Sequence, residues 1–134
     1  MGHIRILLID QQPDSEKAAL IKASDDLLLI AHTRPVENFS QLCDEYKPDL
    51  ILIELPNAEM IDTIREMRLH CPDTKIVIFS PLKDPAVIRA AINAGVVGYL
   101  LEGSLQDDLV LSLLTAQAGK AVFSSEVTRL LLGD

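Results

Sequence analysis

The sequence predicts an α/β fold, a doubly wound parallel sheet of five strands with helices on both faces. Short apolar runs rich in β-branched residues alternate with longer segments of helical periodicity, which is typical of strand–helix units around a parallel sheet. Two of these runs end on an acid, Asp10 and Glu54. Ligands bind parallel sheets beyond the carboxyl ends of the strands, so we expect the two acids to share one crevice there.

Length and composition limit the function classes. A chain of 134 residues suits one domain with its own core, and 49% hydrophobic with 24% charged residues is a globular composition. No apolar stretch reaches the length of a membrane span and no secretory leader is present, so we expect a cytoplasmic location and no membrane partner. The net charge of −8 and the scattered Lys and Arg residues argue against nucleic-acid binding by this segment. The three histidines show no metal-ligand spacing, and we expect surface positions for His3, His32 and His70.

The predicted strands begin near Ile4, Leu27, Leu50, Lys75 and Val96. The spacing between them leaves room for one helix after each strand. Right-handed crossovers then place these helices on both faces of the sheet.

Helix boundaries are clear for the third and fourth helices. Apolar residues at helical spacing predict a third helix over residues 58–70. The fourth is expected to start at Asp84, a capping acid followed by Pro85 at the first helical position, and to stop at Gly95.

The fifth helix, predicted over residues 105–118, follows a sequence at Ser104 that resembles a capping box. Its apolar residues occupy two sides, with Leu109 and Leu113 on one and Leu111 and Leu114 toward the other. This is more apolar surface than one sheet-facing side requires. A second copy of the chain would cover the extra stripe, but we expect the last segment of the chain, residues 127–132, to do so.

Four segments, in the right order, resemble the receiver domain of two-component response regulators: residues 4–13, 47–54, 73–80 and 94–101. The likeness is densest to the subgroup with a LuxR/NarL-type helix-turn-helix output, and residues 119–127 are similar to the segment that leads into that output module. The resemblance implies a flavodoxin-like sheet of order 2-1-3-4-5, a receiver domain at 1–120 and the start of a C-terminal linker or helix at 121–134.

The resemblance also implies a role in phosphorelay signal transduction or transcription regulation. The partners it implies are proteins, namely a sensor kinase or a second copy bound through the fourth and fifth helices. DNA would be contacted only through a C-terminal module absent from this chain.

Receivers of this family phosphorylate an aspartate at the end of the third strand, with Mg²⁺ held by that aspartate and two acids after the first strand. A hydroxyl and a lysine contact the phosphoryl group, because the reaction depends on positioning and charge neutralisation. Asp10 and Ser80 match this pattern, but the second acid is Gln11, a poorer ligand for a hard cation. Glu54 replaces the acceptor, and its extra methylene would move the carboxylate by about 1 to 1.5 Å.

The family's lysine is replaced by Glu102. If Glu102 points inward, Asp10, Glu54 and Glu102 gather like charges where a phosphoryl dianion would need a cation. If Glu102 turns into solvent, the cation is still missing. Both orientations predict loss of phosphotransfer.

Three further positions border this pocket. Pro56 stands where a backbone carbonyl helps to hold the metal in the family, and because proline keeps its carbonyl we expect at most weak Mg²⁺ binding at Asp10, Glu54 and Pro56. Lys83 is a candidate substitute counter-ion. Tyr99 matches the family's switch aromatic, and its plain alternative is a strand residue half-buried against the fourth helix.

We therefore predict a degenerate receiver domain, not an enzyme, that signals or assembles without conventional Asp phosphorylation and without a resident cofactor. Three alternatives remain. The first is a receiver that still accepts a phosphoryl group with Mg²⁺. The second is a cation-sensing module built on Asp10, Glu54 and Glu102, and the third is a dimerisation scaffold.

Overall fold

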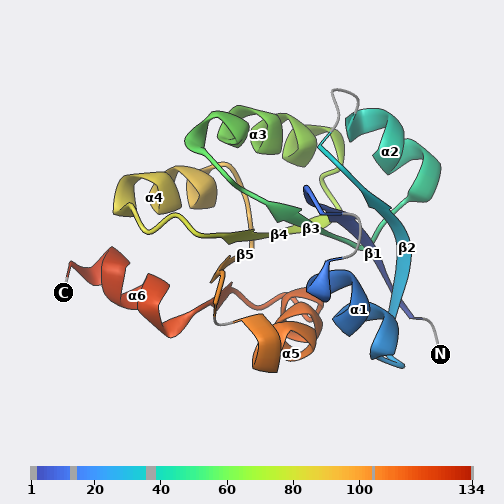
Figure 1. Cartoon of the computed structure of the whole chain (residues 1–134). Coiled ribbons are helices and arrows are strands. Elements are labelled where there is room, and N and C mark those ends of the chain that lie inside the picture. The colour runs from blue at the N-terminus through green and yellow to red at the C-terminus, as the bar shows by residue number, and fades with distance from the viewer. Residues whose placement is uncertain (1–2, 13–14, 36–38, 104, 134) are drawn as a thin grey trace.

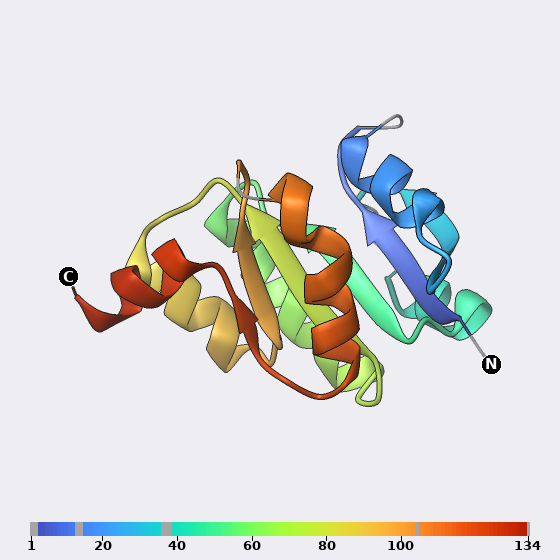
Figure 2. The same ribbon diagram turned by 90° about the horizontal axis from the view of Figure 1, so that it is seen from below.

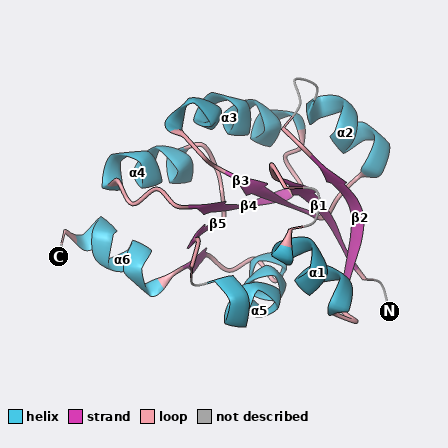
Figure 3. Ribbon diagram, viewed as in Figure 1, coloured by secondary structure: helices cyan, strands magenta, loops and turns pink. Residues whose placement is uncertain are grey.

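A computed structural model of the chain describes residues 3–12, 15–35, 39–103 and 105–133. Its centre is one parallel sheet with the strand order β2-β1-β3-β4-β5-β6 (Figures 1 and 3). The strands are β1 (Ile4–Ile9), β2 (Leu27–Thr33), β3 (Leu50–Glu54), β4 (Lys75–Ser80), β5 (Gly98–Leu101) and β6 (Val122–Phe123). The predicted α/β class and the order of the first five strands are confirmed, and the predicted count of five strands is one too low.

Helices cover both faces of the sheet, as predicted (Figure 1). One face carries α2 (Phe39–Tyr46), α3 (Ile61–His70) and α4 (Pro85–Asn93), and the other carries α1 (Glu16–Ala23) and α5 (Leu105–Gln117). A last helix, α6 (Ser125–Leu132), lies beside α4. None of the described helices is long and apolar enough to cross a membrane.

The core explains why the central strands are almost continuously apolar. In β3, Ile51 and Ile53 belong to the cluster that packs under α2, α3 and α4, whereas Leu50 and Leu52 belong to the cluster under α1 and α5. All four side chains are completely buried. A parallel strand with helices on both faces has no solvent side, so polar residues appear only at its ends.

The helix boundaries agree with the capping signals where the structure describes them. The Asp84 carboxylate accepts a hydrogen bond from the N–H of Ala86, and Gly95 ends the α4 region with a φ of 105°. The third predicted helix is divided into a 3₁₀ turn, η1 (Ala58–Met60), and α3, because Asn57 caps the turn first. The capping motif at Ser104 lies outside the described residues.

The sixth strand depends on a glycine. Gly98 of β5 pairs with Val122 of β6, and a Cβ added at Gly98 would lie 2.8 Å from the Val122 carbonyl oxygen. Only glycine therefore allows the two strands this close approach. After β6 the chain turns into α6 and crosses to α4 (Figure 2).

The expectation that the last segment covers the outer stripe of α5 is wrong. Val127, Leu130 and Leu131 pack into the cluster beneath α4, not onto α5. Leu111 of α5 stays 64% exposed, whereas Leu109 and Leu113 are buried against the sheet. The register of β6 along β5 fixes this path, since it delivers α6 to the α4 side of the sheet.

Candidate functional site

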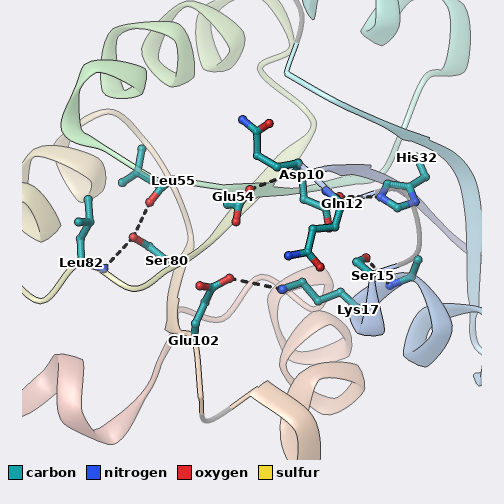
Figure 4. A network of polar contacts seen from close by, with 12 residues as sticks. Asp10, Gln12, Ser15, Lys17, His32, Glu54, Leu55, Ser80, Leu82 and Glu102 are labelled. Atoms are coloured by element: carbon teal, nitrogen blue, oxygen red, sulfur yellow. Dashed lines mark hydrogen bonds and ion pairs between the residues drawn. The ribbon is translucent and has the colours of Figure 1, made fainter.

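The predicted pocket residues meet at the carboxyl ends of four strands (Figure 4). Asp10 follows β1, Glu54 ends β3, Ser80 ends β4 and Glu102 follows β5. Parallel pairing places these ends at one edge of the sheet, so residues far apart in the sequence become neighbours.

Asp10 is the most deeply buried acid of the site. Its side chain is 2% exposed, and its Oδ1 lies 2.7 Å from Nε2 of His32 on β2. The same oxygen accepts a hydrogen bond from the N–H of Gln12 at 3.2 Å. The other oxygen, Oδ2, is buried and finds no hydrogen-bond partner among the described residues, which is costly for a carboxylate.

We expected His32 at the surface, but most of its side chain is buried. Its side chain is 15% exposed and faces the buried Asp10 (Figure 4). His70, in contrast, is an exposed residue on α3 that pairs with Asp44 at 3.1 Å.

Glu54 is half-buried and accepts a hydrogen bond from the N–H of Gln11 at 3.1 Å. Burial raises the pKa of the Glu54 carboxyl, and the charges of Glu102 and Asp10 raise it further; the Gln11 N–H and the Lys17 ammonium act in the opposite direction. The carboxylate of Glu54 therefore lies within the electrostatic reach of Glu102 and Asp10.

Glu102 pairs with a lysine of α1. Its Oε1 lies 3.4 Å from Nζ of Lys17, and the two side chains are 32% and 19% exposed. The Lys17 ammonium also lies 4.3 Å from the centroid of the Phe79 ring, a cation–π contact. A lysine of α1 thus neutralises the acid that stands where the family has its own lysine (Figure 4).

Ser80 links the pocket to the following loop. Its hydroxyl donates to the carbonyl of Leu55 at 2.6 Å and accepts from the N–H of Leu82 at 3.0 Å. Tyr99, which is completely buried, donates its hydroxyl to the Leu82 carbonyl at 2.9 Å. Burial raises the pKa of Tyr99, and a hydrogen bond with Ser80 lowers it. Tyr99 is a strand residue that packs in one cluster with Ile88 and Ala91 of α4, as the plain alternative expected, but it is completely buried and not half-buried. Its role as a switch aromatic stays a prediction.

The residues present do not fit the family's Mg²⁺ site. The unpartnered Oδ2 of Asp10 is a suitable ligand atom, but Gln11 supplies no second acid and Asp10 Oδ1 is already held by His32. Among the described residues no group of three or more His, Cys, Asp or Glu side chains is placed to hold a metal ion. Pro56 lies half-buried just beyond β3.

Lys83 forms an ion pair with an acid outside the predicted pocket set. Its Nζ lies 2.9 Å from Oε2 of Glu126 on α6, so the predicted substitute counter-ion pairs elsewhere. The sequence reasoning missed Lys17, which takes that role. One signal in the sequence could have indicated Lys17. It lies in the first turn of a helix, where a positive charge is unfavourable for the helix dipole, and a nearby acidic partner would offset that cost.

A neutral side chain at position 54 is expected to stabilise the fold. The raised pKa means that the folded state disfavours ionised Glu54, so this residue favours folding at low pH and loses that contribution as the pH rises through its folded pKa. Glu54→Gln keeps an acceptor for the Gln11 N–H and should raise Tm by about 1–4 °C at neutral pH, an effect that fades in acid. Exposed Glu45→Gln is the matched control, and an equal shift in both variants would contradict this account.

Comparison with known proteins agrees with this geometry. No family model matches the chain. The transcriptional regulatory protein YxjL of Bacillus subtilis (strain 168), itself uncharacterized, is 30% identical over 124 residues, which are 90% of this chain and 57% of YxjL. The nitrate/nitrite response regulator NarL of Escherichia coli (strain K12) is 31% identical over 130 residues, which are 94% of this chain and 60% of NarL. The chain thus spans less than two thirds of the length of these relatives.

Solved structures share the fold. A LuxR-family two-component response regulator from Aurantimonas sp. SI85-9A1 superposes with a TM-score of 0.87 at 24% identity, over 98% of this chain and 96% of that one. The receiver domain of the putative response regulator NarL from Mycobacterium tuberculosis gives a TM-score of 0.79 at 18% identity, over 90% of this chain and 100% of that one. The 30% and 31% identity to YxjL and NarL, together with this shared fold and strand order, identifies the chain as a response-regulator receiver domain of the LuxR/NarL type.

Proposed function

We propose that this receiver domain acts in cytoplasmic signal transduction or transcription regulation without phosphorylation of its pocket and without enzymatic activity of its own. The observation that carries the proposal is the ion pair between Glu102 and Lys17. The residue that would bind a phosphoryl group has become an acid, and the nearby cation is already engaged by that acid at 3.4 Å.

Electrostatics support the proposal. Phosphoryl transfer places additional negative charge beside the acceptor and needs a cation or a metal to neutralise it. Glu54 already lies near Glu102 and Asp10, which disfavour further negative charge. Asp10 is bound by His32 and Gln11 is neutral, so the metal that could offset this charge lacks its ligands.

Glu54 itself supplies a permanent charge in our proposal. It stands at the end of β3, where the family places the phosphorylated residue, and its hydrogen bond to the Gln11 N–H holds the carboxylate at the mouth of the pocket. One carboxylate carries less charge and fewer oxygens than a phosphoryl group. The domain would therefore hold one signalling state and be controlled through its partners.

The relatives and the exposed surface of α5 are the basis for the protein partners that we propose. A sensor kinase or a second copy of the chain is proposed, with the second copy bound through α5, where Leu111 is exposed, and the neighbouring α4. YxjL and NarL are longer than this chain, which covers 57% and 60% of them. We propose that contact with DNA would need a further C-terminal module of the kind that their additional length allows.

The direct test is incubation with Mg²⁺ and a small acyl phosphate, followed by measurement of the intact mass. We expect no phosphoryl adduct on the wild-type chain, because Lys17 is engaged by Glu102 and Gln11 stands in place of the second acid for the metal. Glu54→Ala controls for transfer to other residues. A stoichiometric adduct on the wild type that is absent from Glu54→Ala would overturn the proposal and establish an unusual phosphoacceptor.

A further inference from the structure

β2 forms one margin of the central sheet (Figures 1 and 3). It pairs with β1 on one side, and within the described part of the chain no strand pairs with its other side. A strand in this position leaves the N–H and C=O groups of alternate residues without a ladder partner. The outer edge of β2 can therefore accept one more strand.

The two edges of the sheet differ in how well they are protected. β6, at the opposite margin, has two residues and offers few groups to a further strand. β2 has seven residues, LLLIAHT, with no proline, lysine, arginine or acid among them. A register shift leaves Ile30 without a partner on β1, which bends the strand but keeps most of its donors and acceptors. Short length, charges and proline are the usual ways to block an edge, so β2 is the edge that is open to pairing.

Two apolar side chains of β2 lie outside the core of the domain. Leu27 and Leu29 pack into the cluster under α1 and α5, and Ala31 packs into the cluster on the opposite face. Leu28 and Ile30 belong to neither of these clusters of described residues. Leu28 is 45% exposed, and Ile30 is half-buried. A strand added at this edge would bring cross-strand apolar contacts to both.

The two ends of β2 carry opposite charges. Asp25 and Asp26 precede the strand, Arg34 follows it, and all three residues are exposed. The ion pairs between described residues do not involve these three side chains. Two copies of β2 that run antiparallel would place the acids of one copy beside the arginine of the other, twice about a two-fold axis. A parallel pair would place like charges together, which is unfavourable.

We propose that the outer edge of β2 is a pairing site for a second copy of this chain, which adds its own β2 antiparallel and joins the two sheets. Each copy then uses its long edge once, so the assembly closes at two copies. This interface is separate from the α5 surface and goes beyond the function proposed above, because it requires neither the pocket nor a phosphoryl group. One strand pair buries a small area, so we expect a weak dimer with a Kd of roughly 0.1 mM.

Sedimentation equilibrium over a concentration series up to about 1 mM tests the dimer. Leu28→Lys places a charge on the edge and should weaken association about 10-fold or more. Leu111→Lys on α5 changes another exposed leucine, is the matched control and should leave association unchanged. A wild-type chain that stays monomeric throughout the series overturns the proposal. Association that Leu28→Lys leaves intact, or that both variants weaken equally, overturns it as well, because the effect would not be specific to β2.

The antiparallel orientation has its own test. Arg34→Asp should weaken association about 5-fold, since the change acts twice in a symmetric dimer, and Asp26→Arg added to it should restore most of the affinity. Hydrogen exchange of the amides in residues 27–33 should be slower at high than at low protein concentration, with no such change in β6. If the double variant associates as weakly as Arg34→Asp, or if exchange in β2 does not depend on concentration, antiparallel pairing of β2 is wrong.

Discussion

Replacing His32 with alanine is expected to lower the free energy of unfolding by about 2–4 kcal/mol, somewhat below the usual cost of removing one partner from a fully buried charged pair. Asp10 is 2% exposed and His32 15%, so the pair is largely shielded from water in the folded protein and the carboxylate would lose a contact in a mostly buried site. Within the described part of the chain, Asp10 would keep the hydrogen bond from the Gln12 N–H alone, and its Oδ2 has no partner there. Urea denaturation of the wild type and of His32→Ala measures this difference in unfolding free energy, provided that the dependence of the free energy on urea concentration is similar for the two proteins.

A second His–Asp pair in the same chain provides the control. His70 and Asp44 lie 3.1 Å apart with side chains 41% and 74% exposed, so His70→Ala should cost at most about 1 kcal/mol. His32→Gln keeps an N–H donor and should recover part of the loss. Asp10→Asn in the His32→Ala background should recover more, because it removes the buried charge. If His32→Ala and His70→Ala lowered the free energy of unfolding equally, burial of the His32–Asp10 pair would not account for the predicted loss.

The meeting of the pocket residues was predictable from the sequence because topology alone determines it. Asp10, Glu54, Ser80 and Glu102 each follow an apolar run, and parallel strands bring such positions to one edge whatever the side chains are. The absence of the family's lysine was equally readable. What the sequence could not provide was the partner of each acid.

His32 shows why such a partner was missed. Leu27 and Leu29 of β2 pack on the α1 and α5 side, whereas Ala31 belongs to the opposite cluster. The irregularity opposite Ile6 and Leu7 shifts the register by one residue, so the alternation of faces along β2 changes there. A one-residue shift reverses the face of every later side chain, and it brings His32 to the side of Asp10.

Lys17 was missed for a different reason. Its partner is 85 positions away in the sequence, and the ion pair requires α1 to pack beside α5 on the face below β5. Periodicity predicts which side of a helix is buried but not which loop its polar residues reach. The sixth strand was not predicted either, because a strand of two residues is too short to show an alternating pattern. It is recognised in the structure by its close approach to Gly98.

The pocket should regain phosphotransfer when four residues are changed together. Gln11→Asp restores the acid pair for Mg²⁺, Glu54→Asp shortens the acceptor and Glu102→Lys returns the phosphoryl-binding cation. The structure adds a fourth change, Lys17→Ala. Without it, a lysine at position 102 would face Lys17, which lies 3.4 Å from the present Glu102 carboxylate, and the two cations would repel each other.

Incubation with Mg²⁺ and an acyl phosphate should then give one phosphoryl adduct on the four-residue variant and little on the variant that retains Lys17. In this step an oxygen of the carboxylate at position 54 bonds to phosphorus while the acyl oxygen–phosphorus bond breaks, and the donor leaves as its carboxylate. The same variant with alanine at position 54 must stay unmodified. If the four-residue variant is folded but not phosphorylated, the defect lies outside these residues. The cause would then be the loop from Ser80 to Lys83, which is bonded to Tyr99 and to Glu126 of α6 and which positions the hydroxyl that must contact the phosphoryl group.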